Sequence, residues 1–262
     1  MELQTYLGQK GYTIPKNQLT IEQQKQIRND LTIKPFSLQG SNEKTFPAYR
    51  ESAAKFYVPH YYGVEKYGAP KEYKISEGTN IDLEFAGKLR ENQEVVVNTY
   101  IKHVEKVGFG GGLLELPCAY GKTVLSLNII SRLKKKTFII VHKEFLMNQW
   151  IERIQQFLPT ARVGKIQGPT IDIEDKDIVI GMLQSLSMKE YPASTFESFG
   201  LTIIDEVHHI SSEVFSNSLF KLVTKYMLGL SATMNRKDGT TSVFKMFLGD
   251  IIFKGKRDEE RE

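Results

Sequence analysis

The sequence predicts an α/β fold, with a mostly parallel sheet covered by helices on both faces and a small aromatic-rich α+β domain before it. Three observations predict this fold. Continuous apolar strands alternate with amphipathic helices from residue 89 onward, as in a parallel sheet buried on both faces. The apolar run Leu113–Leu116 leads into a loop that closes with Gly121, Lys122 and Thr123 at the start of a helix. A second apolar run, Leu201–Ile204, ends in two adjacent carboxylates.

Composition and charge limit the class of protein. The chain has 262 residues, of which 40% are hydrophobic and 25% charged, and this suits one large domain with a small one. We expect an accessory domain over 1–88, the large domain over 89–253 and a charged tail over 254–262. No apolar run approaches the ~20 residues needed to span a bilayer, and Met1–Gln4 has no secretion signal. Cys118 is the single cysteine, so the chain has no internal disulfide, and a reducing intracellular compartment is expected. The net charge of +4 permits nucleic-acid binding without establishing it.

The predicted accessory domain contains one clear helix and a cluster of aromatic side chains. The helix is expected over 21–33, with Thr20 as its N-cap. The aromatic cluster, interleaved with lysine and arginine, is either a surface on which bases stack or the core of a small domain, and the second interpretation is favoured. A turn between two short strands is expected over 77–80. The aromatic residues are Phe46, Tyr49, Phe56, Tyr57, Tyr61, Tyr62, Tyr67 and Tyr73.

The loop before the first long helix of the large domain predicts a phosphate-binding site. Backbone N–H groups at a helix N-terminus have no partner within the helix, and the helix dipole favours an anion there. Gly121 lets the backbone approach a phosphate, Lys122 supplies a charge, and the Thr123 hydroxyl can ligate magnesium. The usual first glycine of such a loop is replaced by Leu116. The glycine run over 108–112 precedes a strand, so we interpret it as a flexible lead-in and not as a dinucleotide fingerprint.

The remaining elements follow from hydrophobic periodicity. A helix is expected over 95–107 before the first strand, and the helix after the phosphate loop over 124–133. Further strands are expected over 137–141, 162–167, 178–182, 201–204 and 226–230, and further helices over 144–158, 213–223 and 243–248. In the helix over 144–158, Trp150 lies on the apolar face, so we expect it in the core and not as a platform for bases.

The carboxylates that follow the strand over 201–204 predict the chemistry. Asp205 can hold magnesium through water, and Glu206 is placed to orient and deprotonate an attacking water. The alternative is an acidic pair that caps a helix, which leaves the following histidines unexplained. His208 and His209 have no cysteine beside them, so a zinc site is not expected. Ser231 and Thr233 leave another strand end, where hydroxyls can bond the carboxylate loop.

Taken together, these motifs resemble those of the superfamily 2 helicases, which carry Asp-Glu-x-His boxes. More narrowly, the chain is similar to the XPB-type helicases of transcription and repair and to the transcript-release helicases of large DNA viruses. Three stretches carry this resemblance: Leu116-Pro117-Cys118 before the phosphate loop, Asp205-Glu206-Val207-His208, and the run over 228–233. It covers residues 89–253 and implies a RecA-like first domain.

The resemblance also implies site residues. Gln93 and Arg90 fall in the adenine-reading motif, His208 links nucleotide to nucleic acid, and Arg236 lies where the family has a further motif. The residues implied to bind ATP are Arg90, Gln93, Pro117, Cys118, Ala119, Tyr120, Gly121, Lys122 and Thr123. The implied catalytic residues are Lys122, Asp205 and Glu206, the magnesium ligands Thr123 and Asp205, and the coupling residues His208, Ser231 and Thr233. Those implied to bind nucleic acid are Lys143, Gln149, Gln184, Ser185 and Arg236.

These observations predict an ATP-driven nucleic-acid helicase or translocase that uses ATP and magnesium. DNA is the favoured partner, RNA remains open, and transcription or repair machinery is implied; no membrane is involved. Helicases of this type hydrolyse ATP between two similar domains, and only nine residues follow Phe253. We therefore expect an N-terminal piece of a longer enzyme that hydrolyses ATP weakly alone. A nucleic-acid-binding module with little ATPase and an ATPase acting on protein partners stay open as alternatives.

Overall fold

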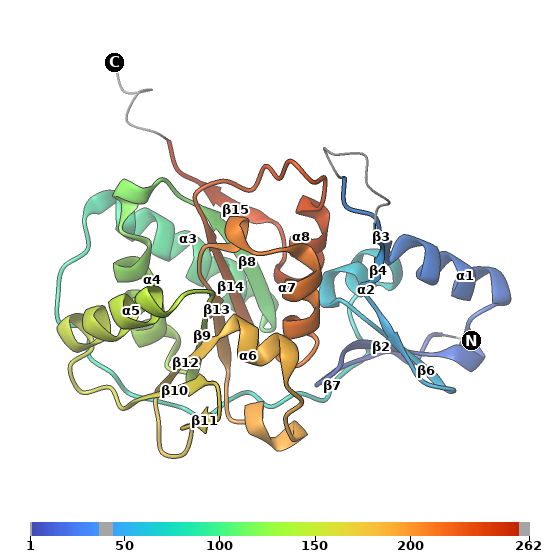
Figure 1. The fold of residues 1–262 in the computed structure, drawn as a ribbon, viewed down its shortest axis with the longest axis horizontal. Helices are drawn as coiled ribbons and strands as arrows, with labels where there is room; N and C mark the ends of the chain where they lie inside the picture. The colour runs from blue at the N-terminus through green and yellow to red at the C-terminus, as the bar shows by residue number, and fades with distance from the viewer. Residues whose placement is uncertain (1, 37–43, 257–262) are drawn as a thin grey trace.

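An eight-stranded sheet dominates the structure, a computed structural model that describes residues 2–36 and 44–256 (Figure 1). Its strand order is β11-β10-β12-β9-β13-β14-β8-β15. All neighbours pair in parallel except β10 and β11, which are antiparallel. The strands are β8 (Gly110–Glu115), β9 (Thr137–Val141), β10 (Val163–Gln167), β11 (Thr170–Ile171), β12 (Ile178–Met182), β13 (Leu201–Ile204), β14 (Tyr226–Ser231) and β15 (Ile251–Lys254).

Helices cover both faces of this sheet, which confirms the predicted RecA-like architecture (Figure 1). Successive side chains of a strand point to opposite faces, so β9 sends Ile139 to one apolar core and Phe138 and Ile140 to the other. The first face carries α3 (Glu91–Val107), α4 (Lys122–Leu133) and α5 (Glu144–Phe157), and the second carries α6 (Leu183–Met188), α7 (Ser212–Leu219) and α8 (Thr241–Leu248). The carboxyl ends of the parallel strands therefore form one open edge between two helical layers.

The N-terminal part forms a five-stranded sheet in the order β5-β6-β2-β1-β7 (Figure 1). Its helix α2 packs against α8 of the large part, as we call the part that contains the eight-stranded sheet. A separate two-stranded sheet joins β3 to β4. The elements are β1 (Tyr6–Gly8), β2 (Gly11–Pro15), α1 (Ile21–Asp30), β3 (Thr32–Ile33), β4 (Phe46–Pro47), β5 (Arg50–Glu51), β6 (Lys55–Val58), α2 (His60–Tyr67) and β7 (Glu72–Tyr73). The domain boundaries at 88 and 253 stay predictions.

Most of the aromatic cluster lies inside or against this N-terminal part. Phe46, Phe56 and Tyr62 are buried in its core, so for them the core interpretation is confirmed. Arg50 extends to the large part, where its Nη2 donates to Asn217 Oδ1 at 2.9 Å and its guanidinium lies 4.7 Å from the Phe220 ring centroid. The cations among the aromatic residues therefore serve contacts within the protein as well.

One expectation about glycine is wrong, because packing overrides local preference. Gly110–Gly112 are not a flexible lead-in but the buried first half of β8. A Cβ on Gly111 would lie 2.4 Å from the Leu248 carbonyl oxygen, so only glycine lets α8 approach this strand. Another close approach involves Gly63 inside α2, where a Cβ would lie 2.2 Å from the Tyr12 ring.

Several predicted boundaries also move. The helix capped by Thr20 ends at Asp30 and not at Ile33, because Thr32 and Ile33 pair with β4. The helix expected over 213–223 ends at Leu219. No turn joins two strands over 77–80. Instead, this stretch makes backbone hydrogen bonds to the part that contains the eight-stranded sheet: Thr79 donates its N–H to the Ser198 carbonyl and accepts from the Lys136 N–H.

The sequence patterns missed α6, β11 and β15, whose apolar runs are short. Among the described residues, no helix combines the length and the apolarity that crossing a membrane requires.

Candidate nucleotide site

The phosphate loop occupies the open edge of the large sheet, between β8 and α4. After β8, Cys118–Tyr120 form one 3-10 turn, and Gly121 takes a left-handed conformation with φ of 70°. A Cβ on Gly121 would lie 2.8 Å from Gln93 Nε2, so glycine satisfies both the dihedral angle and the close contact. Thr123, the second residue of α4, is half-buried beside this loop. The first backbone N–H groups of α4 therefore face the loop and lack helical partners.

Lys122 is a buried cation at the start of α4. Its Nζ donates to the Leu116 carbonyl oxygen at 3.4 Å, and it forms no ion pair with any of the described residues. Leu116 itself is fully buried, and its N–H donates to the Ser231 carbonyl oxygen at 2.8 Å. Its φ is not positive, so the backbone at this position does not require glycine. A buried charge normally requires a counter-charge, so the head of α4 suits an anionic ligand.

Arg90 and Gln93 hold the phosphate loop from the start of α3. Gln93 is buried; its Oε1 accepts from the Arg90 N–H at 2.9 Å, and its Nε2 donates to the Tyr120 carbonyl oxygen at 2.8 Å. Arg90 Nη2 donates to the Ala119 carbonyl oxygen at 2.8 Å. The structure thus joins the predicted adenine-reading residues to the loop, 27 residues away for Gln93.

Asp205 follows β13 at the same edge, two strands from β8. The carboxylate is buried, and Oδ2 accepts a hydrogen bond from the indole Nε1 of Trp150 at 2.9 Å. Burial raises the pKa of Asp205; the Trp150 hydrogen bond opposes that shift, the Glu206 charge adds to it, and the Lys122 charge opposes it. Lys122 is thus close enough to Asp205 to act on it electrostatically.

Glu206 and the two histidines follow directly. Glu206 has φ of 54° and ψ of 43°, a left-handed conformation that residues with a Cβ rarely take and that is often found at functional sites. Val207–His209 then form a 3-10 turn. Glu206 Oε2 lies 3.3 Å from His208 Nε2 and 3.5 Å from His209 Nε2. The carboxylate is therefore turned toward the histidines, and the acidic pair does not cap a helix.

Ser231 connects the histidine turn to the end of β14. Its Oγ lies 3.0 Å from His208 Nδ1. The same oxygen donates to the Thr233 carbonyl and accepts from the Thr233 N–H at 3.2 Å. The three residues expected to couple the sites therefore form one connected network.

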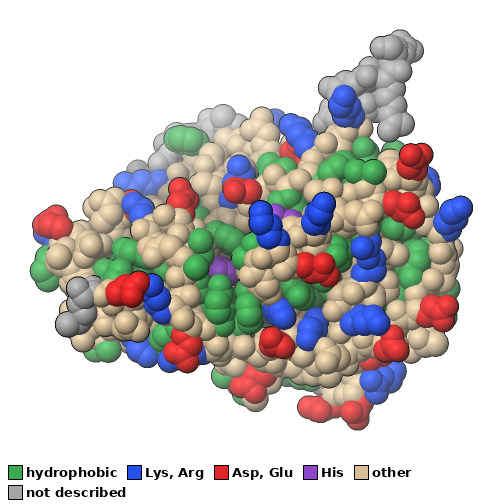
Figure 2. Space-filling view, turned by 180° about the vertical axis from the view of Figure 1, so that it is seen from behind, with side chains coloured by type: hydrophobic (Ala, Val, Ile, Leu, Met, Phe, Trp, Pro, Cys, Tyr) green, Lys and Arg blue, Asp and Glu red, His purple; other side chains and the backbone are tan. Residues whose placement is uncertain are grey.

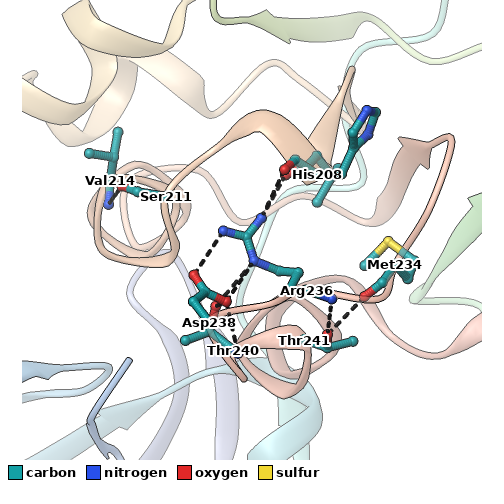
Figure 3. A network of polar contacts seen from close by, with 9 residues as sticks. His208, Ser211, Val214, Met234, Arg236, Asp238, Thr240 and Thr241 are labelled. Carbon is teal, nitrogen blue, oxygen red and sulfur yellow. Dashed lines mark hydrogen bonds and ion pairs between the residues drawn. The ribbon is translucent and has the colours of Figure 1, made fainter. Parts of the chain in front are cut away.

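Arg236 binds the backbone of His208, one member of this network, as Figure 3 shows. Its Nη1 donates to the His208 carbonyl oxygen at 3.2 Å, and its Nη2 lies 3.1 Å from Asp238 Oδ2. The guanidinium also packs over Phe244, 4.5 Å from the ring centroid. Most donors of Arg236 are thus used inside the protein, an arrangement that favours a positioning role over a direct contact with nucleic acid.

The other residues expected to bind nucleic acid differ in exposure. Lys143, the N-cap residue of α5, and Gln149 on α5 are exposed. Gln184 is also exposed, and its Nε2 donates to the His142 carbonyl oxygen at 2.9 Å. Ser185 is buried, and its Oγ accepts from the Gly168 N–H at 3.0 Å, so its side chain supports the fold. On the face in Figure 2, basic and acidic side chains are interspersed, with no continuous basic stripe.

Two site residues lay beyond sequence reasoning. Trp150 was expected only in the core; it is buried there, but it also binds the candidate magnesium ligand across 55 residues of chain. Glu115, at the end of β8, accepts from the Met234 N–H at 2.6 Å and lies 3.2 Å from Lys254 Nζ. It thus ties the phosphate-loop strand to the loop after β14 and to β15. No local pattern marks either role.

Comparisons with known proteins identify the family and the fold of the chain. The family described as "Type III restriction enzyme, res subunit" matches residues 86–236. A protein of Acanthamoeba polyphaga mimivirus, assigned as an ATP-dependent RNA helicase, is 36% identical over 257 residues, which cover 95% of this chain and 49% of that protein. A DNA 3'-5' translocase of Sulfurisphaera tokodaii is 31% identical over 204 residues, which cover 76% of this chain and 44% of that one.

Two solved structures share the fold. The UvsW helicase of bacteriophage T4 has a TM-score of 0.61 at 14% identity, over 97% of this chain and 100% of that one. The Sulfolobus solfataricus SWI2/SNF2 ATPase core in complex with double-stranded DNA has a TM-score of 0.51 at 22% identity, over 64% of this chain and 37% of that one. The chain spans about half the length of the curated relatives described above.

Proposed function

The chain belongs to the family of the type III restriction enzyme res subunit, within the superfamily 2 helicases, and from this premise we propose that it is the ATP-binding half of a nucleic-acid helicase or translocase. A second RecA-like domain, which supplies the arginines that complete such a site, belongs to the remainder of the enzyme. Alone, the chain binds ATP and hydrolyses it weakly.

One observation carries this proposal: the buried ammonium of Lys122 at the head of α4 has no carboxylate partner among the described residues. Asp205 is the nearby acid, yet its Oδ2 is turned to Trp150. A phosphate group at the N-terminus of α4 would supply the missing counter-charge. Its oxygens would also accept hydrogen bonds from the free N–H groups of the first turn. A merely structural lysine would be expected to pair with the carboxylate beside it.

The remaining roles follow from position. Thr123 and Asp205 offer the oxygen ligands that magnesium prefers, and the ion, when bound, neutralises charge on the phosphate oxygens. Glu206 orients and deprotonates the attacking water from its fixed left-handed position. Arg90 and Gln93 read the adenine while they hold the loop carbonyls of Ala119 and Tyr120.

In this proposal, nucleic acid binds to the exposed polar side chains that border the same edge of the large sheet. Lys143, Gln149 and Gln184 are exposed there and suit contacts with phosphate oxygens, which are independent of sequence and weaken with salt. His208 and Ser231 link this side to the nucleotide. DNA is the preferred partner in this proposal, RNA is the second, and an intracellular location is part of it.

The decisive experiment measures ATP binding and steady-state hydrolysis, with and without DNA or RNA, for the wild type and two variants. Lys122→Ala is expected to abolish nucleotide binding. Glu206→Gln is expected to keep binding and to lose roughly 10²–10⁴ in hydrolysis, the usual contribution of a general base. Lys237→Ala, which changes an exposed lysine next to Arg236, serves as the matched control. Unchanged ATP binding in Lys122→Ala would overturn the proposal.

A further inference from the structure

Three side chains that follow β13 bring their ligand atoms together. One oxygen of Glu206 and one ring nitrogen each of His208 and His209 lie within 4.8 Å of one another. Glu206 Oε2 lies 3.3 Å from His208 Nε2 and 3.5 Å from His209 Nε2. Two ligands bound tetrahedrally to one zinc ion, each at about 2.1 Å, are themselves about 3.4 Å apart. Both distances, 3.3 Å and 3.5 Å, match that edge.

The hydrogen bonds of Ser231 determine which nitrogen of His208 is free. A serine hydroxyl has one donor and two acceptor positions. Ser231 Oγ donates to the Thr233 carbonyl and accepts from the Thr233 N–H, which leaves one acceptor position. His208 Nδ1, 3.0 Å away, must therefore carry the proton and donate. Nε2 of the neutral ring is then an unprotonated lone pair that faces Glu206.

A lone pair and a carboxylate oxygen 3.3 Å apart repel each other unless a cation lies between them. Either a proton on His208 or a metal ion can fill that place. A metal ligand histidine usually donates its other ring N–H to a protein acceptor, and Ser231 is such an acceptor. His209 is exposed, so its ring can turn toward an ion without repacking the core.

We propose that Glu206, His208 and His209 form a site for a transition-metal ion of the zinc type, with one coordination position left open. A carboxylate with two imidazoles suits zinc, cobalt or nickel and not magnesium, which prefers oxygen ligands. No cysteine lies beside the histidines in the sequence, but Glu206 supplies the third ligand, because its left-handed backbone places the carboxylate next to both rings.

The site has a regulatory consequence that rests on the proposed function. A metal ion on Glu206 engages the carboxylate that would otherwise accept the proton of the attacking water, so zinc is expected to inhibit ATP hydrolysis. Metal binding itself needs no nucleotide and no ATPase activity, so the two ideas fail separately.

The test titrates the 262-residue chain with Zn²⁺ alone in a calorimeter, and with Co²⁺ followed by its visible absorption. One zinc ion is expected to bind, and Co²⁺ to give the intense bands of a tetrahedral site. His209→Ala and Glu206→Gln should each weaken binding roughly 10–100-fold, as loss of a ligand or its support does. Circular dichroism checks that both variants fold.

Two further variants make the outcome specific. His103→Ala removes an exposed histidine of α3, and Cys118→Ser removes the exposed thiol of the phosphate loop. Both should bind zinc as the wild type does. No zinc binding, or binding that survives His209→Ala but is lost with Cys118→Ser, would overturn the proposal and leave a proton between Glu206 and His208.

Discussion

The indole nitrogen of Trp150 on α5 donates a hydrogen bond to the buried carboxylate of Asp205 at 2.9 Å, although the two residues are 55 positions apart. The bond holds one oxygen of Asp205 and, by favouring the ionised form, opposes the effect of burial on its pKa. The helix that follows β9 thus positions the acid that follows β13.

The first prediction concerns this bond. Trp150→Phe keeps most of the apolar volume but removes the N–H donor, so the pKa of Asp205 should rise further. A hydrogen bond to a charged group contributes about 1.5–3 kcal/mol, and the free energy of unfolding should fall by that order. Calorimetric titration should also show a higher magnesium requirement for ATP binding. Ile154→Val, on the same buried helical face, should lower stability without changing that requirement; an equal change in both variants would refute the role.

A second prediction concerns Arg236 and the pH dependence of stability. Burial raises the pKa of Asp238, but hydrogen bonds from Arg236 and Thr240 and the Arg236 charge lower it more, so the net shift is downward. A lowered pKa stabilises the fold above the unfolded-state value of about 4, and this stability is lost as pH falls through the folded-state value.

Arg236→Ala should weaken this pH dependence and lower the free energy of unfolding by about 2 kcal/mol at neutral pH, because Asp238 and the His208 carbonyl lose the guanidinium donor. Urea unfolding at neutral and acid pH measures both effects. The exposed neighbour Lys237→Ala should behave as the wild type; the same acid response in Arg236→Ala as in the wild type would contradict the assignment.

The third prediction tests Glu115 as the tie between β8 and the loop after β14. Glu115→Ala leaves the buried Met234 N–H without its acceptor, which should cost about 1–3 kcal/mol of unfolding free energy. Glu115→Gln keeps an amide oxygen for this bond and should recover most of the loss. Thermal or urea unfolding of the two variants decides between them, and equal destabilisation by both would show that the charge, through Lys254, matters instead.

A fourth prediction concerns Gly63 in α2. Alanine is the better helix former by about 1 kcal/mol, but its Cβ would lie 2.2 Å from the buried Tyr12 ring. Gly63→Ala should therefore destabilise the protein by about 1–3 kcal/mol, the usual cost of overpacking. Glu65→Ala, at an exposed position of the same helix, should stay within about 0.5 kcal/mol of the wild type. Greater stability in Gly63→Ala would show that the ring moves away easily.

Local sequence was sufficient to predict the strands that are buried on both faces of the sheet. The strands over 137–141, 178–182 and 201–204 match β9, β12 and β13 to the residue, because each is a continuous apolar run bounded by polar residues. The same patterns placed Asp205 directly after one strand and Lys122 at the end of the loop that follows another, and parallel strands end at one edge. The glycine run over 108–112 misled, because the reason for Gly111 is the approach of Leu248 at the end of α8, which is more than 100 residues away.

Local pattern and motif thus predict the class of fold and the groups that would meet a nucleotide, since both depend on residues close together in the chain. Only the tertiary structure determines the hydrogen bonds that hold these groups in place. Trp150 donates to Asp205, Arg236 donates to the His208 carbonyl, and the Met234 N–H donates to Glu115. These bonds join segments brought together by the order of the strands, and strand order depends on long-range packing that no short stretch of sequence encodes.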